Sequence, residues 1–438
     1  MSGLTKFFYS TMEGAPVLNA SWGSLLNMFR TIATGEFNAQ IASTVTISDN
    51  LATINFDTPH NFIRYQVVKL SGANEPQFNK EFRVYSTSPT SIVIKCEDTD
   101  TIVTGTITVS TAGLGWTETH TGDNKAVFRA KDDIENPFYL RIDDSCPVGY
   151  TTTWGKFARV TISSGIDSID DYGVHYKAPQ NSEHVNTNER GDGVTGANGI
   201  YGWAKWYHGL GPGTNYYYEN VKSISDTIPL GWEIVGDDSG IYLYVDYTNS
   251  PGRLLYAFTA INKLNPLDKF NCYLSAVECL NKASDRLPYT SSSSGIYRGV
   301  SQDSGATDGK FILRDYLGAG VSHTSPSIYS LAFSSISGHT STLPFPNRVD
   351  NSIILHDIYV RDGGFGIRGT LPIIKWVHHR WSNGNYNILD NGSEVYIVIE
   401  GSRGNPGYSH SEGNYAYAYE LVGWWLILED IDTGDYTI

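Results

Sequence analysis

The chain has 438 residues and a formal net charge of −15, from 31 Lys and Arg against 46 Asp and Glu. Because a single hydrophobic core stops growing at roughly 250–300 residues, this length predicts several modules. The acidic balance disfavours a nucleic-acid partner, and a hydrophobic fraction of 40% with a charged fraction of 18% excludes a largely disordered chain. The sequence contains neither a secretory signal nor an apolar run long enough to span a membrane, so we expect synthesis in a cytoplasm and no membrane insertion.

Residues 1–37 are predicted to form an N-terminal docking leader with one short helix. The helix is expected to have Ser21 as its cap and to end at Gly35, with its apolar residues on one side. Because a helix of about three turns is marginal alone in water, this side must pack against the body of the chain or against a neighbouring subunit. The predicted contact residues of the leader are Trp22, Leu25, Met28 and Phe29.

Beyond the leader the hydrophobic pattern changes to a period of two, which is typical of half-buried strands. Segments such as FRVYST and TGTITVST are separated by turn residues, and Gly113-Leu114-Gly115-Trp116 is predicted as the hinge that closes the first group. Residues 253–264 fit a helix or a buried strand, and we favour the strand. The predicted fold is mainly β, with several antiparallel β-sandwich or barrel-like modules and one short N-terminal helix. We predict three β modules after the leader. Residues 38–135 form a β-sandwich or barrel, and residues 136–262 form a second β module with a Gly-, Tyr- and Trp-rich loop. Residues 263–438 form a C-terminal β module.

The segment 191–218 is rich in glycine and aromatic residues, which is typical of a long functional loop or an interface. Exposed aromatic rings suit both the stacking of sugars and the apolar centre of a protein interface. An interface needs no further polar machinery, so we favour it over a sugar site. The predicted contact residues here are Trp203, Trp206, Tyr207, Tyr216, Tyr217 and Tyr218.

Candidate cofactor and metal motifs fail on their context. Residues 191–196 match G-x-G-x-x-G but lack the apolar strand before it and the helix after it that a dinucleotide site requires. His378 and His379 are adjacent, and adjacent residues of a strand point to opposite faces, so both ligate one ion only across a bulge. The acidic segment 430–435 lacks the EF-hand pattern. We therefore predict no cofactor, no cofactor-binding residue and no metal-ligating residue.

Acidic clusters such as Asp143-Asp144 and Asp167 with Asp170 and Asp171 offer many carboxylate pairs. Glycosidases need two facing carboxylates at a defined separation, so the clusters alone identify no site. The sequence has no G-x-S-x-G motif and no local signature of a thiol protease. We predict no catalytic residue, with a glycan-degrading enzyme that uses an acidic pair as an alternative.

Several short motifs in residues 1–160 occur in a recognisable combination. They are Tyr9-Ser10, Gly14-Ala15-Pro16-Val17-Leu18, Gly35-Glu36-Phe37, Gly115-Trp116, Asn124-Lys125-Ala126 with Arg129, and Leu140-Arg141-Ile142-Asp143-Asp144. In this combination the chain resembles a family of tailed-bacteriophage virion proteins, which are structural proteins of the tail, baseplate or neck. The match weakens after Arg159. No motif in it is catalytic, so the resemblance implies a place in the virion and no chemistry.

The expected function is that of a structural component of a tailed-phage virion that acts through protein–protein assembly contacts and is not an enzyme. Its expected partners are other virion proteins, including copies of itself. The alternative is a receptor-binding spike or fibre element that contacts host-surface glycan. The expected location is the virion, after synthesis in the host bacterial cytoplasm. We also expect that deletion of residues 1–37 leaves the β modules folded and blocks incorporation into particles.

Overall fold

The fold is mainly β, as predicted, and its described strands form four antiparallel sheets with one α-helix, α1 (Ser24–Thr34), and one short 3-10 helix, η1 (Pro76–Phe78). In none of the sheets does the order of the described strands close into a barrel. The computed structural model describes residues 4–97, 102–131, 138–147, 152, 155, 157–171, 173, 175, 177–178, 203–209, 227–246, 253–266, 269–279, 310–315, 327–330, 349, 355–362, 366–377, 388–390, 395–399 and 424–428.

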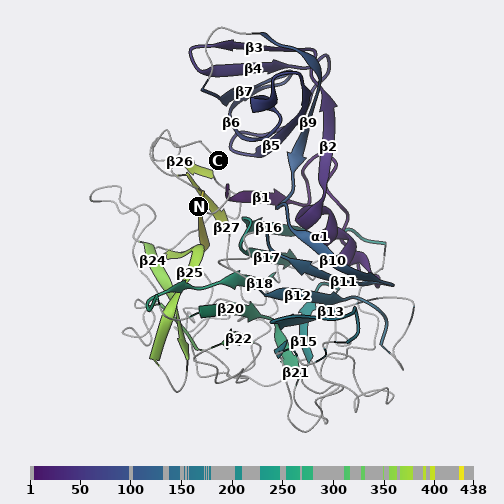
Figure 1. Ribbon diagram of the computed structural model, residues 1–438, viewed down its shortest axis with the longest axis vertical. Coiled ribbons are helices and arrows are strands. Elements are labelled where there is room, and N and C mark those ends of the chain that lie inside the picture. The colour runs from purple at the N-terminus through teal and green to yellow at the C-terminus, as the bar shows by residue number, and fades with distance from the viewer. Residues whose placement is uncertain are drawn as a thin grey trace, which may run out of the picture.

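The first sheet forms an upper module, residues 36–112, at the top of Figure 1. Its strands alternate buried and exposed residues, as in β4, where Ala52 and Ile54 point inward, so one face encloses an apolar core. The order is β2-β9-β5-β6-β7-β4-β3-β8. Its strands are β2 (Glu36–Ile41), β3 (Thr44–Ser48), β4 (Leu51–Asn55), β5 (Val67–Ala73), β6 (Glu81–Ser88), β7 (Ser91–Lys95), β8 (Ile102–Val103) and β9 (Gly105–Ala112).

Two further sheets and helix α1 form the body of the molecule, below the upper module in Figure 1. The six-stranded sheet has the order β1-β16-β17-β18-β20-β22, and the seven-stranded sheet has the order β10-β11-β12-β13-β15-β21 with β14 paired to β13. The first contains β1 (Lys6–Tyr9), β16 (Trp232–Gly236), β17 (Ile241–Asp246), β18 (Arg253–Ala260), β20 (Lys269–Ser275) and β22 (Lys310–Asp315). The second contains β10 (Thr117–Gly122), β11 (Lys125–Arg129), β12 (Tyr139–Asp143), β13 (Phe157–Ser163), β14 (Lys177–Ala178), β15 (Trp203–Tyr207) and β21 (Val277–Cys279).

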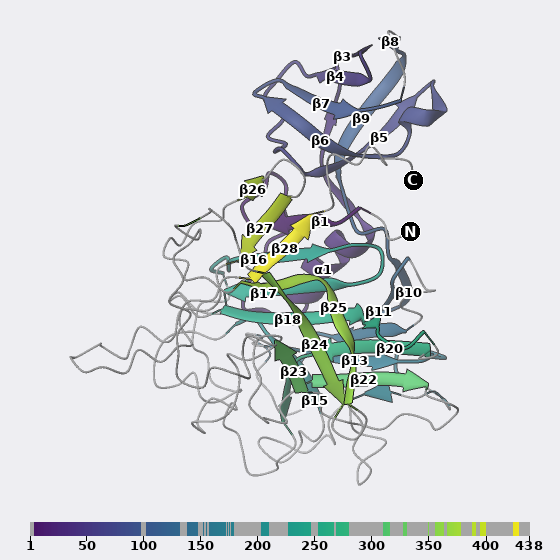
Figure 2. The same cartoon turned by 90° about the vertical axis from the view of Figure 1, so that its left-hand side faces the viewer.

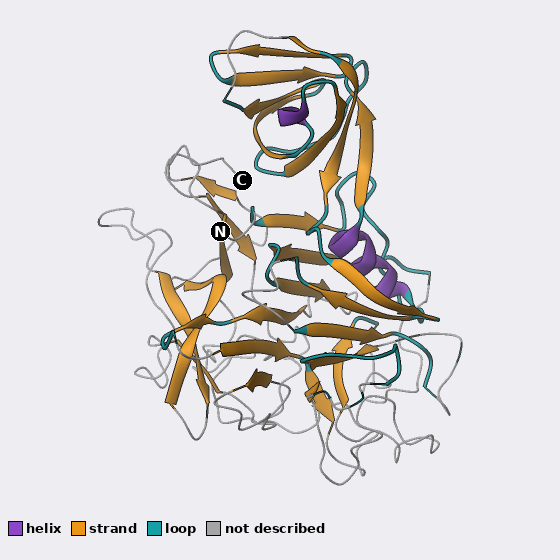
Figure 3. Ribbon diagram, viewed as in Figure 1, coloured by secondary structure: helices purple, strands orange, loops and turns teal. Residues whose placement is uncertain are grey.

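An aromatic cluster joins these two sheets and the helix. The Phe29 ring of α1 lies 5.0 Å from that of Phe128 on β11 and 6.1 Å from that of Trp206 on β15. Trp206 in turn stacks on Tyr256 of β18 at 5.7 Å, and the Tyr256 hydroxyl accepts the Tyr207 N–H at 2.7 Å. The helix is therefore part of the body core, and Figure 3 shows it beside the body strands, below the upper module.

A fourth sheet lies across the body, where Figure 2 shows β24 and β25 crossing in front of the body strands. The Tyr242 hydroxyl of β17 donates to the Pro372 carbonyl of β25 at 2.6 Å, and Leu371 and Ile374 belong to the body core. The order is β23-β24-β25-β28-β27-β26, with β19 paired to β25. The strands are β19 (Asn262–Lys263), β23 (Ser327–Ser330), β24 (Leu355–Asp362), β25 (Gly366–Val377), β26 (Ile388–Asp390), β27 (Val395–Ile399) and β28 (Trp424–Leu428).

The strand pairing corrects the predicted module boundaries. The first sheet ends with β9, and β10 and β11 belong to the body, so the division lies at residues 113–116 and not at 135. The boundary at 262 does not separate sheets either, because β20 and β22 continue the sheet of β16 to β18. A period of two identifies strands but does not show which distant strands pair. The predicted hinge at Gly113–Trp116 does lie at the division, and residues 253–260 are a strand, as favoured.

Candidate functional site

Helix α1 begins without a cap of its own. Its N-cap is Gly23, which offers no side chain, and the first turn contains no acidic residue, so the prediction of Ser21 as the cap is wrong. Instead, Asp144 accepts the Leu25 and Leu26 N–H groups on its Oδ2 at 2.9 and 3.2 Å. A carboxylate at this position satisfies two orphan donors and lies favourably in the field of the helix dipole. The cap is therefore supplied from the residue after β12, more than a hundred positions along the chain.

Gly23 packs against the turn between β10 and β11, where no other residue type fits. Its φ is +86°, and a Cβ at this position would lie 2.3 Å from Oδ1 of Asn124. Gly23 N–H donates to the Asp144 carbonyl at 3.0 Å, and Asp144 N–H donates to the Asn124 carbonyl at 2.8 Å. These three residues thus connect the leader, the β10–β11 turn and the end of β12 through their backbones.

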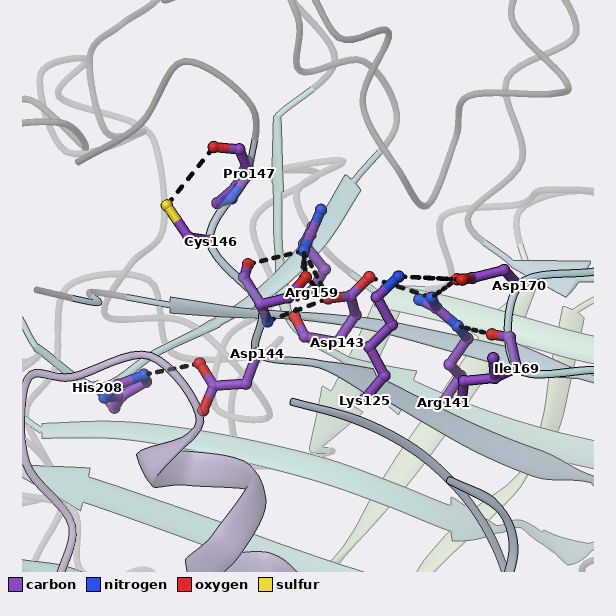
Figure 4. A network of polar contacts seen from close by, with 11 residues as sticks. Lys125, Arg141, Asp143, Asp144, Cys146, Pro147, Arg159, Ile169, Asp170 and His208 are labelled. Carbon is purple, nitrogen blue, oxygen red and sulfur yellow. Dashed lines mark hydrogen bonds and ion pairs between the residues drawn. The ribbon is translucent and has the colours of Figure 1, made fainter. Parts of the chain in front are cut away.

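Next to this cap lies a network of charges, shown in Figure 4, which is buried at Arg141, Asp143 and Arg159. Lys125 and Asp170, at its edge, are partly exposed. The Arg141 guanidinium contacts Asp143 at 3.0 Å and Asp170 at 2.7 Å, and the Arg159 guanidinium contacts Asp143 at 2.5 Å. The Lys125 ammonium contacts Asp170 at 3.0 Å. We call the network of Lys125, Arg141, Asp143, Asp144, Arg159, Asp170 and His208 the leader lock.

The protonation of the lock follows from this pairing. Burial alone would raise the pKa of Asp143, but the Arg159 and Arg141 guanidinium groups and a hydrogen bond from Ser145 outweigh it and hold the pKa below its ordinary value. Burial also acts on Asp170, where Lys125 and Arg141 outweigh it and lower the pKa. Both carboxylates are therefore held in the charged form, each beside a fixed cation.

His208 connects the lock to the leader. Its Nδ1 lies 3.1 Å from the Asn19 carbonyl, and its Nε2 lies 3.7 Å from Oδ1 of Asp144. Both side chains are fully buried, and no described residue is a hydrogen-bond partner of Nε2 or Oδ1. The imidazole thus sits between the leader and the residue that caps its helix.

The leader residues predicted as contacts pack inside the chain itself, which corrects the prediction of an interface. Leu25, Met28 and Phe29 are fully buried in the body core, and Trp22 is half-buried with its ring 5.6 Å from that of Phe157. The apolar side of a helix needs a partner, and here the two body sheets provide it. These side chains are therefore not available to another subunit in this fold.

The prediction that the aromatic loop forms an interface is also wrong for those of its residues that the structure describes. Trp206 and Tyr207 are fully buried, because they lie on β15 in the middle of the body and not on an exposed loop. Trp203 begins the same strand. Tyr216, Tyr217 and Tyr218 lie outside the described residues, as do the G-x-G-x-x-G segment, His378, His379 and the acidic segment 430–435.

Only some residues of the leader lock could be predicted from the sequence. Lys125, Arg141, Asp143 and Asp144 belong to the motifs that carry the family resemblance, so that combination was a usable signal. Asp170 was named only as a member of an acidic cluster, and His208 lies in no motif, because both reach the lock through tertiary packing. In the described parts of the chain, no three His, Cys, Asp or Glu side chains are placed to hold a metal ion, and no helix is long and apolar enough to cross a membrane.

Comparison with known proteins adds little to this site. No protein-family model matches the chain, and no curated protein matches it. Among solved structures, the Phage phi92 endosialidase matches with 9% sequence identity over 92% of this chain and 53% of that chain, at a TM-score of 0.16. The chain thus spans about half the length of that structure, and a likeness at this score carries no argument about fold or activity.

Proposed function

We propose that the chain is a structural component of a tailed-bacteriophage particle, in the tail, baseplate or neck, and that it acts through contacts with other particle proteins and not through catalysis. One observation carries the proposal. Two of the motifs that resemble the virion family, Asn124-Lys125-Ala126 and Leu140–Asp144, meet in the leader lock. Two others contact helix α1, where Gly35 is its C-cap and the Trp116 ring lies 6.0 Å from that of Phe29. A combination of motifs that builds one structural unit is stronger support for the resemblance than the same motifs scattered over the fold.

The chemistry of the lock fits an architectural role. Its Asp and Arg side chains are engaged with each other, and the Asp144 carboxylate is used on the helix N-terminus. Removing one member of the buried Arg141–Asp143–Arg159 set leaves a charge without compensation. Next to this set, Asp144 and His208 connect the body to the leader. A rigid body with a fixed N-terminal segment is suited to repeated, identical contacts in a particle.

The upper module offers apolar surface for such contacts. Ile41 and Ile102 are each 68% exposed, and they lie on β2 and β8, the two strands at the ends of the sheet order. Exposed apolar residues on edge strands favour association with another protein. We therefore place the assembly surface of this proposal on the upper module.

The test is the protein content of purified particles. Mass spectrometry of virions from cells that produce the Ile41→Lys/Ile102→Lys variant should show the chain depleted relative to wild type, while the purified variant unfolds at the same denaturant concentration. The matched control is Thr87→Lys, an exposed position on the inner strand β6, away from the two edge strands. Absence of the wild-type chain from virions, with abundant chain in infected-cell extract, would refute the proposal.

A further inference from the structure

Two neighbouring cavities open along the upper module. The first, of about 240 Å³, is lined both by the upper module and by body residues that include Lys6 and Lys131. The second, of about 790 Å³, is lined by the upper module alone. They share Lys80, Phe82, Tyr85 and Lys95, so they are two parts of one groove, which we call the cationic groove.

The first cavity concentrates positive charge in an acidic protein. Among the described residues, its lining contains two acidic side chains, Glu81 and Asp238. The chain as a whole has a net charge of −15, so this local excess of cations is opposite to the overall balance. A cleft lined by one sign of charge raises the local concentration of ligands of the other sign. The cations that line it are Lys6, Lys69, Lys80, Arg83, Lys95 and Lys131.

Part of this charge has no ion-pair partner among the described residues. Lys6 pairs with Glu81 at 2.7 Å and Lys69 pairs with Glu36 at 2.6 Å. Lys80 and Lys131 make no ion pair with any described residue, and the Lys80 ammonium lies 5.3 Å from the centre of the Phe82 ring. Burial and, to a smaller extent, the Lys131 ammonium lower the pKa of Lys6 against the opposing effect of Glu81, as expected where cations crowd together.

The groove also presents an aromatic face. The β6–β7 register shifts between Val84 and Ser86, and this bulge leaves Tyr85 38% exposed. The Lys95 ammonium lies 5.2 Å from the centre of the Tyr85 ring. Bulges of this kind re-aim a side chain and are frequent beside functional sites. Tyr85 and the flanking ammonium groups thus combine a flat apolar surface with donors for an anion.

From this geometry we propose that the cationic groove binds an acidic oligosaccharide, with a sugar carboxylate in the first cavity beside Lys80 and Lys131 and a neighbouring sugar ring against Tyr85. The second cavity, whose lining also contains Asp49 and Glu97, accommodates the following sugars. A peptide is disfavoured, because strand addition needs a sheet edge, and Phe82, Tyr85 and Lys95, which line both cavities, lie on the inner strands β6 and β7. The inference goes beyond the assembly role and does not depend on it.

The test uses the full-length chain on an array of oligosaccharides that contain carboxylated sugars. Each is printed beside its carboxyl-reduced, neutral counterpart, and acidic peptides of equal charge are included. We expect binding to acidic oligosaccharides that is lost on carboxyl reduction and weakened by added salt. A blank array, equal binding to the reduced sugars, or stronger binding to the acidic peptides would overturn the proposal.

Variants then connect the binding to the groove. Because an exposed ion pair contributes up to about five-fold in affinity, Lys80→Ala/Lys131→Ala should weaken the best saccharide by roughly ten-fold or more. Tyr85→Ala should abolish measurable binding, while Tyr85→Phe, which keeps the ring, should retain it. The matched control is Lys263→Ala, which removes a cation on β19 outside the groove. Unchanged affinity in the double Lys variant, with unchanged stability, would refute the assignment.

Discussion

The leader lock and the cationic groove use charged residues in opposite ways. In the lock, Arg141, Asp143 and Arg159 are almost fully buried, and each meets an opposite charge within 3.0 Å. In the groove, Lys80 and Lys131 make no ion pair with a described residue. A buried ion that loses its partner is costly, whereas an exposed ion is solvated by water. The buried charges of the lock therefore stabilise the fold, while Lys80 and Lys131 in the groove remain available to a ligand.

Removal of the leader should have the largest effect. Deletion of residues 1–35 takes β1 away from β16 and removes α1 from the body core, so the body should lose cooperative unfolding. This replaces the expectation from sequence that the β modules stay folded. The upper module has a separate core and should remain protected. Hydrogen exchange measures the protection of the body and of the upper module separately. Full protection of β16 to β18 in the truncated chain would contradict the prediction for the body.

Breaking the lock with one substitution should come next. Asp143→Ala leaves Arg141 and Arg159 without their shared carboxylate, and loss of one member of a buried ion pair costs roughly 3–5 kcal/mol. Urea unfolding of wild type and variant measures this difference. The replacement Arg159→Met serves as a second variant, since it removes a charge and keeps much of the apolar volume. A loss below about 1 kcal/mol for both would mean that the lock behaves like an exposed pair.

At acid pH the Asp143 carboxylate should no longer stabilise the folded chain. The pKa of Asp143 is lowered in the folded chain, so its contribution is complete above the unfolded value of about 3.9 and is lost as the pH falls through the folded pKa. Asp143→Asn resembles the protonated carboxyl in shape. The gap in unfolding free energy between wild type and this variant should therefore be widest near neutral pH and shrink below about pH 4. A gap that grows on acidification would show that the sign is wrong.

A smaller effect is expected where the leader meets the β11 turn. Gly23→Ala forces a side chain into a φ of +86° and against Asn124, and such backbone strain costs about 1–3 kcal/mol. The double variant Gly23→Ala/Asn124→Gly removes the contact with the Asn side chain, and Gly suits the positive φ of 52° at position 124. It should recover part of the loss in thermal unfolding. No recovery would mean that φ alone sets the cost.

The sequence predicted the local parts of this architecture and missed those that depend on pairing. The period of two at β4 and the run at β18 gave strands, and Gly35 marked the end of the helix. The cap of the helix was assigned to Ser21, because no local rule points to a carboxylate at position 144. The aromatic residues of β15 were taken for an exposed interface, since composition alone does not distinguish a buried strand from a contact loop.

The smallest effect is expected at Glu36 and Lys69, an ion pair at the edge of the groove whose side chains are 39% and 44% exposed. Burial raises the pKa of Glu36, but hydrogen bonds from Lys69 and Ser110 and the charge of Lys69 together outweigh this and lower it, so the pair is formed at neutral pH. Solvent screening limits such a pair to less than about 1 kcal/mol, so Glu36→Ala should change urea unfolding by no more than this. The change should shrink further in 1 M salt. A loss comparable to that of Asp143→Ala would remove the contrast between lock and groove, because an exposed pair would then stabilise the fold as strongly as a buried one.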